Sequence, residues 1–163
     1  MVSFPFLIAT VGGTGYFPKA PGTAGSLVGL IIFIILEKMA FSWPLLVLIT
    51  LMAFILGCLN CHWILKDTFF QNNDPAYIVV DEVVGMWLTL LMTGFFYSLT
   101  TFLYLACFGL FRFFDILKPW PIRWLDHFLG RYPSTAALGI MMDDILAAVA
   151  AASFLIASYS LYL

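Results

Sequence analysis

Charged residues are scarce in this chain of 163 residues, making up 10% of it against 63% hydrophobic residues. Such a composition is typical of integral membrane proteins and argues against a soluble enzyme. The formal net charge of −2 provides no basic surface, so nucleic acid is not an expected partner. The length is enough for one domain, and we assign residues 1–163 to it.

Cysteine is also rare, and its three positions, Cys58, Cys61 and Cys107, all fall in apolar stretches. Cys58 and Cys61 have C-x-x-C spacing, but no second pair of ligands accompanies them. We therefore expect small thiols within membrane helices and no zinc site. The N-terminus lacks the basic region and cleavage site of a signal peptide, so the first apolar run is expected to stay in the mature protein.

The apolar segments predict an all-α fold, a polytopic membrane bundle of about five transmembrane helices with a short interfacial helix. The expected spans are residues 24–39, 42–70, 75–96, 98–118 and 133–163, with Asp74 and Ser98 as helix caps and Lys118-Pro119 as a stop. Residues 4–11 are too short to span and are expected to be re-entrant or interfacial. Residues 120–129 place apolar side chains on one face beside two tryptophans, which predicts a helix in the membrane surface.

The few charges recur in three groups inside apolar segments: Asp81-Glu82, Arg112 with Asp115 and Lys118, and Asp143-Asp144. A charge at the middle of a membrane helix costs roughly 2.5–3.5 kcal/mol on insertion scales, so such residues are usually functional. The alternation of the predicted spans brings all three groups to one side of the membrane, together with the glycine-rich residues 12–26. Most lysines and arginines fall on the same side, which the positive-inside rule identifies as the cytoplasm.

Two structural explanations compete with a functional one. Acids near a helix start can simply favour the helix dipole, but caps at Asp74 and Ser134 would leave Asp81 and Asp143 about 10–14 Å inside their helices. Arg112 and Asp115, three residues apart, could form a structural ion pair. Neither explanation balances five acids against one arginine and one lysine in these three groups. A bound cation would, and carboxylate oxygens suit Mg²⁺ or Mn²⁺.

The same groups could hold a phosphate. Arginine offers a planar fork to phosphate oxygens and lysine a point charge. The glycine-rich residues 21–26 precede a predicted helix, whose N-terminus is a natural anion site, although the segment could equally be a tight turn. No Gly-Lys-Ser/Thr follows, so it is not a P-loop. Together these features predict a metal-assisted phosphoryl site that opens onto lipid headgroups.

Four segments resemble the motifs of the phosphatidylglycerophosphatase A family, in the expected order over roughly residues 7–150: PGTAGSL at 21–27, VDEVVGMW at 80–87, FRFFDILKPWPI at 111–122 and GIMMDD at 139–144. Cys61-His62 and Lys66-Asp67 fit the family less diagnostically. The resemblance implies a Mg²⁺-dependent, multi-pass enzyme of the bacterial inner (cytoplasmic) membrane with its active site facing the cytoplasm. Its expected substrate is phosphatidylglycerophosphate, hydrolysed to phosphatidylglycerol and inorganic phosphate in the last step of phosphatidylglycerol synthesis.

On this hypothesis each site residue has an expected role. The expected metal ligands, direct or through water, are Asp81, Glu82, Asp143 and Asp144; the expected phosphate-binding residues are Arg112, Lys118 and Arg123, helped by Thr23 and Ser26. Asp81, Asp115, Asp143 and Asp144 are the catalytic candidates, although Asp115 could simply orient Arg112. The nucleophile stays open between water and a carboxylate.

Two rival functions remain at this point, a CDP-alcohol phosphatidyltransferase and a cation or proton transporter. The transferase usually carries Asp-Gly and Ala-Arg spaced along a helix pair, which this chain lacks. A transporter would place acids along a path, whereas here they cluster on one side. The expected partners are the phospholipid substrate and the bilayer, and the sequence gives no oligomeric state.

Overall fold

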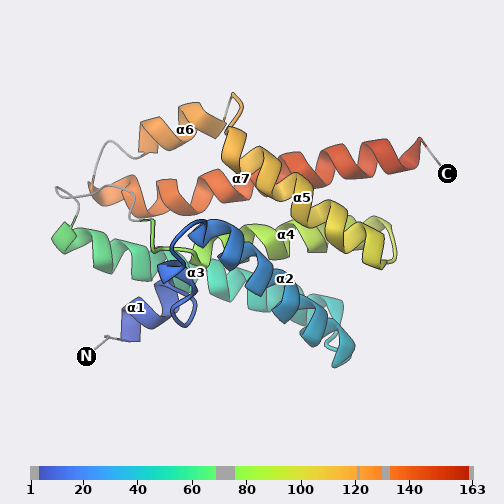
Figure 1. Cartoon of the computed structure of the whole chain (residues 1–163), viewed down its shortest axis with the longest axis horizontal. Coiled ribbons are helices and arrows are strands. Elements are labelled where there is room, and N and C mark those ends of the chain that lie inside the picture. Colours follow the sequence, from blue (N-terminus) through green and yellow to red (C-terminus); the bar gives the residue numbers. More distant parts are fainter. Residues whose placement is uncertain (1–3, 69–75, 121, 130–132, 162–163) are drawn as a thin grey trace.

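The computed structural model describes residues 4–68, 76–120, 122–129 and 133–161 (Figure 1). Within these residues the fold is all-α, as predicted, with seven α-helices, one 3-10 helix and no strand. The elements in chain order are α1 (Phe4–Ala9), η1 (Thr14–Tyr16), α2 (Pro21–Lys38), α3 (Trp43–Thr68), α4 (Val80–Phe96), α5 (Thr101–Leu117), α6 (Ile122–Leu129) and α7 (Pro133–Ser160).

Three helical segments are long and apolar enough to cross a membrane, which indicates a membrane protein: Pro21–Lys38, Trp43–Lys66 and Thr135–Ser160. The predicted number of about five spans is not confirmed, because α4 and α5, with 17 residues each, are slightly shorter than these three segments. At a rise of about 1.5 Å per residue, each of these two helices is about 26 Å long. That length is slightly shorter than the roughly 30 Å hydrocarbon core of a bilayer.

The long helices run alternately in opposite directions, so that the starts of α2, α4 and α7 lie toward the same end of the molecule as the ends of α3 and α5 (Figure 1). The central element is α4, which packs against α2, α3, α5 and α7 and buries most of its side chains. Because α4 is surrounded in this way, any residue in its first turn faces several helices at once.

Small residues on α2 allow it to approach α4 closely. A Cβ built on Gly25 would lie 2.8 Å from Val79 Cβ, and one built on Gly29 would lie 3.1 Å from Val83 Cα. Two glycines four residues apart are a common means of close helix contact in membranes. The indole N–H of Trp87 donates to the Gly29 carbonyl oxygen at 2.8 Å, which fixes the position of α2 along α4.

The N-terminal segment folds back against the residues that lead into α4. The backbone N–H of Val79 donates to the Ala9 carbonyl oxygen at 2.9 Å. Gly15 lies against the Tyr77 backbone, where a Cβ would stand 1.9 Å from the Tyr77 carbonyl oxygen. The Tyr77 ring also stacks on Tyr16, with ring centroids 6.2 Å apart. The N-terminal segment thus holds residues 77–79 in place.

Three helix starts differ from the prediction. α4 begins at Val80 and not near residue 75, because Ile78 and Val79 are buried beneath the N-terminal segment in a non-helical conformation. The expectation that Asp81 lies about two turns inside its helix is therefore wrong: Asp81 and Glu82 are in the first turn, where the helix dipole favours acids. The predicted cap Asp74 lies outside the described residues.

The other two corrections are smaller. α2 begins at Pro21, a few residues before the predicted start, because proline is well suited to the first helical position. α5 begins at Thr101, and its cap is Thr100 and not the predicted Ser98. The Thr100 hydroxyl accepts a hydrogen bond from the Leu103 N–H at 3.3 Å. The predicted stop at Lys118 is confirmed, since α5 ends at Leu117.

Candidate functional site

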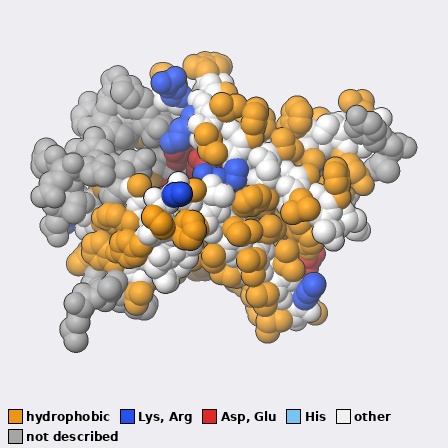
Figure 2. Space-filling view, in the orientation of Figure 1, with side chains coloured by type: hydrophobic (Ala, Val, Ile, Leu, Met, Phe, Trp, Pro, Cys, Tyr) orange, Lys and Arg blue, Asp and Glu red, His pale blue; other side chains and the backbone are white. Residues whose placement is uncertain are grey.

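A polar cavity of about 300 Å³ lies where the starts of α2 and α4 meet the end of α5 and the first half of α7. Seven charged side chains line it, namely Asp81, Glu82, Arg112, Asp115, Lys118, Asp143 and Asp144. Five of these are acids and two are bases. Figure 2 shows acidic side chains between basic ones on one part of the surface, while hydrophobic side chains cover much of the remaining face.

Three of the acids converge. Asp81, Glu82 and Asp144 each bring an oxygen to a common point, with these atoms within 4.8 Å of one another. The side chains are withdrawn from solvent, Asp81 being 8% exposed and Asp144 3% exposed. Among the described residues, the buried Glu82 Oε2 and Asp144 Oδ2 atoms have no hydrogen-bond partner. Carboxylates this close repel one another unless a positive charge lies between them.

This donor set fits a divalent metal ion. Three carboxylates supply the hard oxygen ligands that Mg²⁺ prefers, and the two buried oxygens without a partner are available to it. The group comes from two helices, α4 and α7, whose packing brings the sequence-distant pairs Asp81-Glu82 and Asp143-Asp144 together. Asp143, which was expected among the ligands, is not one of the three.

Asp143 instead forms an ion pair with Lys118, between its Oδ2 atom and the lysine Nζ. A second ion pair joins Arg112 Nη1 to Asp115 Oδ2 at 2.5 Å, one turn apart on α5. Each cation at the cavity is thus held by an acid that lies outside the converging group of three. The ion pairs fix the directions of the guanidinium and the ammonium toward the cavity.

Lys118 reaches α7 because of the backbone at the end of α5. Its φ of 39° and ψ of 62° are left-handed, and its N–H donates to the Phe114 carbonyl oxygen at 2.9 Å. A residue with a side chain in this conformation costs roughly 1–2 kcal/mol relative to the right-handed region. The turn directs the side chain away from the α5 axis, toward Asp143.

The N-terminus of α2 forms another wall of the cavity through Ala20, Pro21, Gly22 and Thr23. No side chain caps this helix at Ala20, so its first N–H groups are available to an anion. Behind them, Arg112 Nη1 donates to Ser26 Oγ at 3.3 Å, and Ser26 Oγ donates to the Gly22 carbonyl oxygen at 2.8 Å. The guanidinium and the helix start therefore approach the same space.

The structure brings together most of the sequence-predicted site. Thr23 lines the cavity with the seven charged residues, whereas Ser26 is fully buried behind it and supports Arg112. Arg123 is exposed on α6 and does not line the cavity. His62 and Lys66 are exposed on α3, and the Asp67 side chain lies outside the described part of the chain.

Sequence reasoning missed the individual role of Gly22. A Cβ at this position would lie 2.2 Å from Glu82 Oε1 and 3.1 Å from Arg112 Nη2, so any larger residue would force these two side-chain ends to move. The sequence does carry a weak signal, because Gly22 belongs to the glycine-rich residues 21–26 that were expected to form an anion site at a helix start. The contact of the N-terminal segment with residues 77–79 had no comparable signal.

The chain is similar in sequence to known proteins that are all named as phosphatases. The sequence pattern of the family described as phosphatidylglycerophosphatase A matches residues 7–159. A phosphatidylglycerophosphatase A of Haemophilus influenzae is 41% identical over 88% of this chain and 81% of its own length. The Escherichia coli protein of the same name is 35% identical over 94% of this chain and 83% of its own. A putative phosphatidylinositol-3-phosphatase of Bacteroides thetaiotaomicron is 38% identical over 89% of this chain and 87% of its own. No solved structure matches this chain significantly.

Proposed function

The chain belongs to the phosphatidylglycerophosphatase A family of phosphatases, and we propose that it hydrolyses phosphatidylglycerophosphate to phosphatidylglycerol and inorganic phosphate in the polar cavity. The observation that carries this proposal is the convergence of Asp81, Glu82 and Asp144 beside two held cations at one end of an apolar bundle. Family membership also favours a phosphatase over the transferase and the transporter that the sequence left open.

Mg²⁺ is the proposed cofactor, held by Asp81, Glu82 and Asp144, with Asp143 beside them. The support is the charge of the cavity, where five acids face two bases, and the buried carboxylate oxygens without a partner among the described residues. When bound, the ion would supply positive charge that neutralises the phosphoryl oxygens. These acids, from two helices, would otherwise repel one another in a site of low dielectric.

The terminal phosphate of the lipid is proposed to bind between Arg112, Lys118 and the start of α2, including Thr23. Arg112 offers two N–H groups in a fork, and Asp115 holds it in place through their 2.5 Å contact. Asp143 holds Lys118 in the same way. Arg123, exposed on α6, is better placed to contact lipid phosphates at the membrane surface than the reacting phosphate.

The reaction then needs a nucleophile and a place for its proton. In the simplest scheme water attacks phosphorus, and the bond from phosphorus to the glycerol oxygen breaks. A carboxylate of the converging group accepts a proton from the attacking water and later loses it to solvent, and the leaving glycerol oxygen takes its proton from a solvent water. Arg112 and Lys118 stabilise the charge on the transferred group. If a carboxylate were the nucleophile, acid quenching during turnover would trap a phosphorylated aspartate.

The proposed membrane arrangement has five spans, adding α4 and α5 to the three long helices. The support is that α4 packs against all three, and α5 against α2, α4 and α7, so both lie at the same depth as the spans. Lys19, Lys66, Lys118 and Arg123 belong to the end of the bundle that holds the cavity, and Lys38 ends α2 at the other. By the positive-inside rule the cavity then faces the cytoplasm, at the inner membrane of a bacterium.

Phosphate release from phosphatidylglycerophosphate by the detergent-purified protein tests this function. We expect release with Mg²⁺, none with a chelator, and recovery when Mg²⁺ is added back. Asp144→Asn should abolish release and weaken Mn²⁺ binding measured by electron paramagnetic resonance. Glu37→Gln, at the opposite end of α2, serves as the control and should leave both unchanged. Absence of release by folded wild-type protein would overturn the proposal.

A second substrate class is favoured by one relative. The Bacteroides protein, 38% identical to this chain, is named a putative phosphatidylinositol-3-phosphatase. Both lipids carry a phosphate monoester at the headgroup, so the same cations could bind either. Release rates on phosphatidylglycerophosphate and phosphatidylinositol 3-phosphate at equal surface concentration separate the two, and we expect phosphatidylglycerophosphate to react faster.

A further inference from the structure

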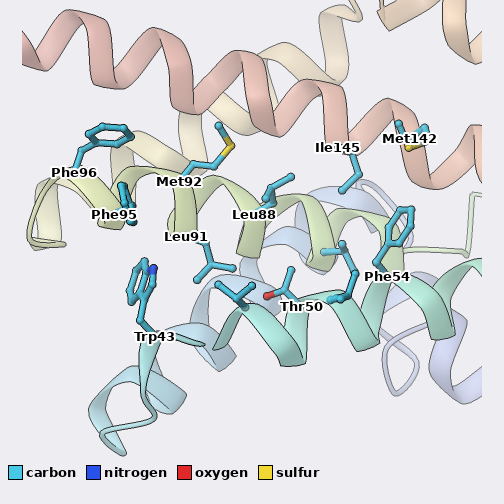
Figure 3. A pocket seen from close by; sticks show the side chains of 13 residues that line it. Trp43, Thr50, Phe54, Leu88, Leu91, Met92, Phe95, Phe96, Met142 and Ile145 are labelled. Carbon is cyan, nitrogen blue, oxygen red and sulfur yellow. The ribbon is translucent and has the colours of Figure 1, made fainter. Parts of the chain in front are cut away.

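A large apolar groove lies between α3, α4 and α7 and shares no lining residue with the charged cavity (Figure 3). Its volume is about 570 Å³, within the roughly 300–1,000 Å³ typical of small-molecule sites, and it is open along one side. Thr50 is the lining residue with a hydroxyl group, and that group donates to the Leu46 carbonyl oxygen at 2.9 Å. A ligand in this groove would meet almost entirely hydrocarbon, so its chemistry must be apolar.

The groove has the length of one bilayer leaflet. It is lined along residues 43–54 of α3 and along residues 84–96 of the antiparallel α4. At about 1.5 Å per residue, each of these stretches measures about 17 Å. Half of the hydrocarbon core of a bilayer is roughly 15 Å thick. The groove therefore matches an extended chain in one leaflet better than a compact apolar molecule.

One end of the groove borders the helical turns that carry the acids. Val84 lies one turn after Asp81 on the same face of α4, and Met142 and Ile145 flank the Asp143-Asp144 pair on α7. In Figure 3, Met142, Ile145 and Phe54 occupy this end, and Trp43, Phe95 and Phe96 occupy the other. A chain in the groove would start at the level of the carboxylates and end among aromatic rings.

We propose that the groove binds one acyl chain of the phospholipid substrate, with the glycerol end toward Asp81 and Asp144. This inference rests on the proposed function, since it names where the apolar part of that substrate lies. A bilayer interior is as apolar as the groove, so the chain gains little from leaving the lipid. Its contribution is orientation, because a headgroup held in register reacts faster than one that is misplaced.

Two neighbouring residues of α3 give a matched pair of variants. Val47 lines the groove about 10 Å along the helix from Phe54, whereas Leu48 does not line it. Their exposures are nearly equal, 47% and 50%. Val47→Trp should fill the groove at a position too far from the carboxylates for a six-carbon acyl chain to reach. A long acyl chain would extend to that position. Leu48→Trp adds the same indole to the surface outside the groove.

The first measurement is kcat/KM for phosphate release from dipalmitoyl and dihexanoyl phosphatidylglycerophosphate in mixed micelles. We expect Val47→Trp to lower kcat/KM roughly tenfold for the long-chain substrate only, because a displaced chain misplaces the headgroup. Activity on the short-chain substrate shows that the variant is folded. Leu48→Trp should match wild type on both. Equal behaviour of Val47→Trp and wild type on the long-chain substrate would overturn the inference.

The second measurement locates the chain without turnover. Long-chain substrate carrying a diazirine at the end of its acyl chain is bound to the protein in the presence of chelator. The complex is irradiated, and the labelled peptides are identified by mass spectrometry. Labelling near Trp43, Phe95 and Phe96 supports the groove, and labelling confined to α2 and α5 overturns it. If wild type releases no phosphate from either substrate, the proposed function fails. If wild type releases phosphate but Val47→Trp has the same kcat/KM as wild type on both the long-chain and the short-chain substrate, only the groove inference fails.

Discussion

Gly22 in the first turn of α2 lies directly against Glu82 in the first turn of α4, where a Cβ on the glycine would stand 2.2 Å from Glu82 Oε1. Two helix starts therefore meet at the cavity, each with the positive end of its dipole near the acids. The contact is tight because α2 and α4 are held together further along by Gly25, Gly29 and the Trp87 hydrogen bond.

Gly22→Ala should therefore inactivate the enzyme while the fold remains intact. The added methyl group would displace Glu82 and crowd Arg112, whose Nη2 atom would lie 3.1 Å from it. We expect kcat for phosphate release to fall by about 100-fold, since misplacing a catalytic group by about 1 Å has an effect of that size. Gly109→Ala on α5 is the matched control, because a Cβ there meets nothing within 4 Å. Full activity of Gly22→Ala would contradict the predicted contact.

Gly15→Ala tests whether the N-terminal segment positions the start of α4. Its Cβ would stand 1.9 Å from the Tyr77 carbonyl oxygen, so residues 77–79 would have to move, and Asp81 with them. We expect the Mg²⁺ concentration for half-maximal activity to rise severalfold, together with a stability loss of about 1–3 kcal/mol from overpacking. A stability loss with an unchanged Mg²⁺ requirement would show that the segment supports only the fold.

A double-mutant cycle on Lys118 and Asp143 separates their two roles. Lys118→Met and Asp143→Asn each break the ion pair and leave a partner in a poorly solvated position. The double variant should lose less free energy of unfolding than the two single variants lose together, with a coupling energy of about 1–2 kcal/mol. Chemical denaturation measures this term. Phosphate release should remain low in the double variant, because the cation proposed to bind substrate is still missing.

Arg112→Ala and Arg123→Ala should differ strongly. Arg112 lines the cavity and contacts Asp115 and Ser26, whereas Arg123 is exposed on α6. Removing one donor that stabilises charge in a transition state typically costs about 100–1,000-fold in kcat, which we expect for Arg112. For Arg123 we expect less than about threefold, since exposed ionic contacts are worth little. Steady-state phosphate release at saturating substrate gives both kcat values. An equal fall in kcat for the two variants would indicate that Arg123 also binds the reacting phosphate.

Much of the site could be predicted because charges are rare in this chain. Asp81, Arg112 and Asp143 stand out against their apolar neighbours, and the alternation of helices places them at one end whatever the details of packing. The stop at Lys118-Pro119 was equally readable, because proline restricts the residue before it. These signals are local, so a sequence carries them without knowledge of the fold.

The errors concern features that tertiary contacts decide. Residues 76–79 have the composition of a helix, but a hydrogen bond from Val79 to Ala9 and burial under the N-terminal segment keep them extended or turned. Ser98 and Thr100 are both acceptable caps by composition, and only the observed bond to Leu103 distinguishes them. The division of the acids, with Asp143 toward Lys118 and Asp144 toward Asp81, depends on the rotation of α7 against α4.

The left-handed backbone at Lys118 limits how far this protein can be stabilised by engineering. Glycine at that position would remove the conformational penalty of roughly 1–2 kcal/mol, and a search for thermostable variants would select it together with Asp143→Asn, which relieves the acid that would otherwise be left without its cation. The same exchange would remove the ammonium group that pairs with Asp143. Thermostability and turnover therefore compete at this residue, and a selection for heat resistance alone should yield well-folded protein that no longer processes lipid.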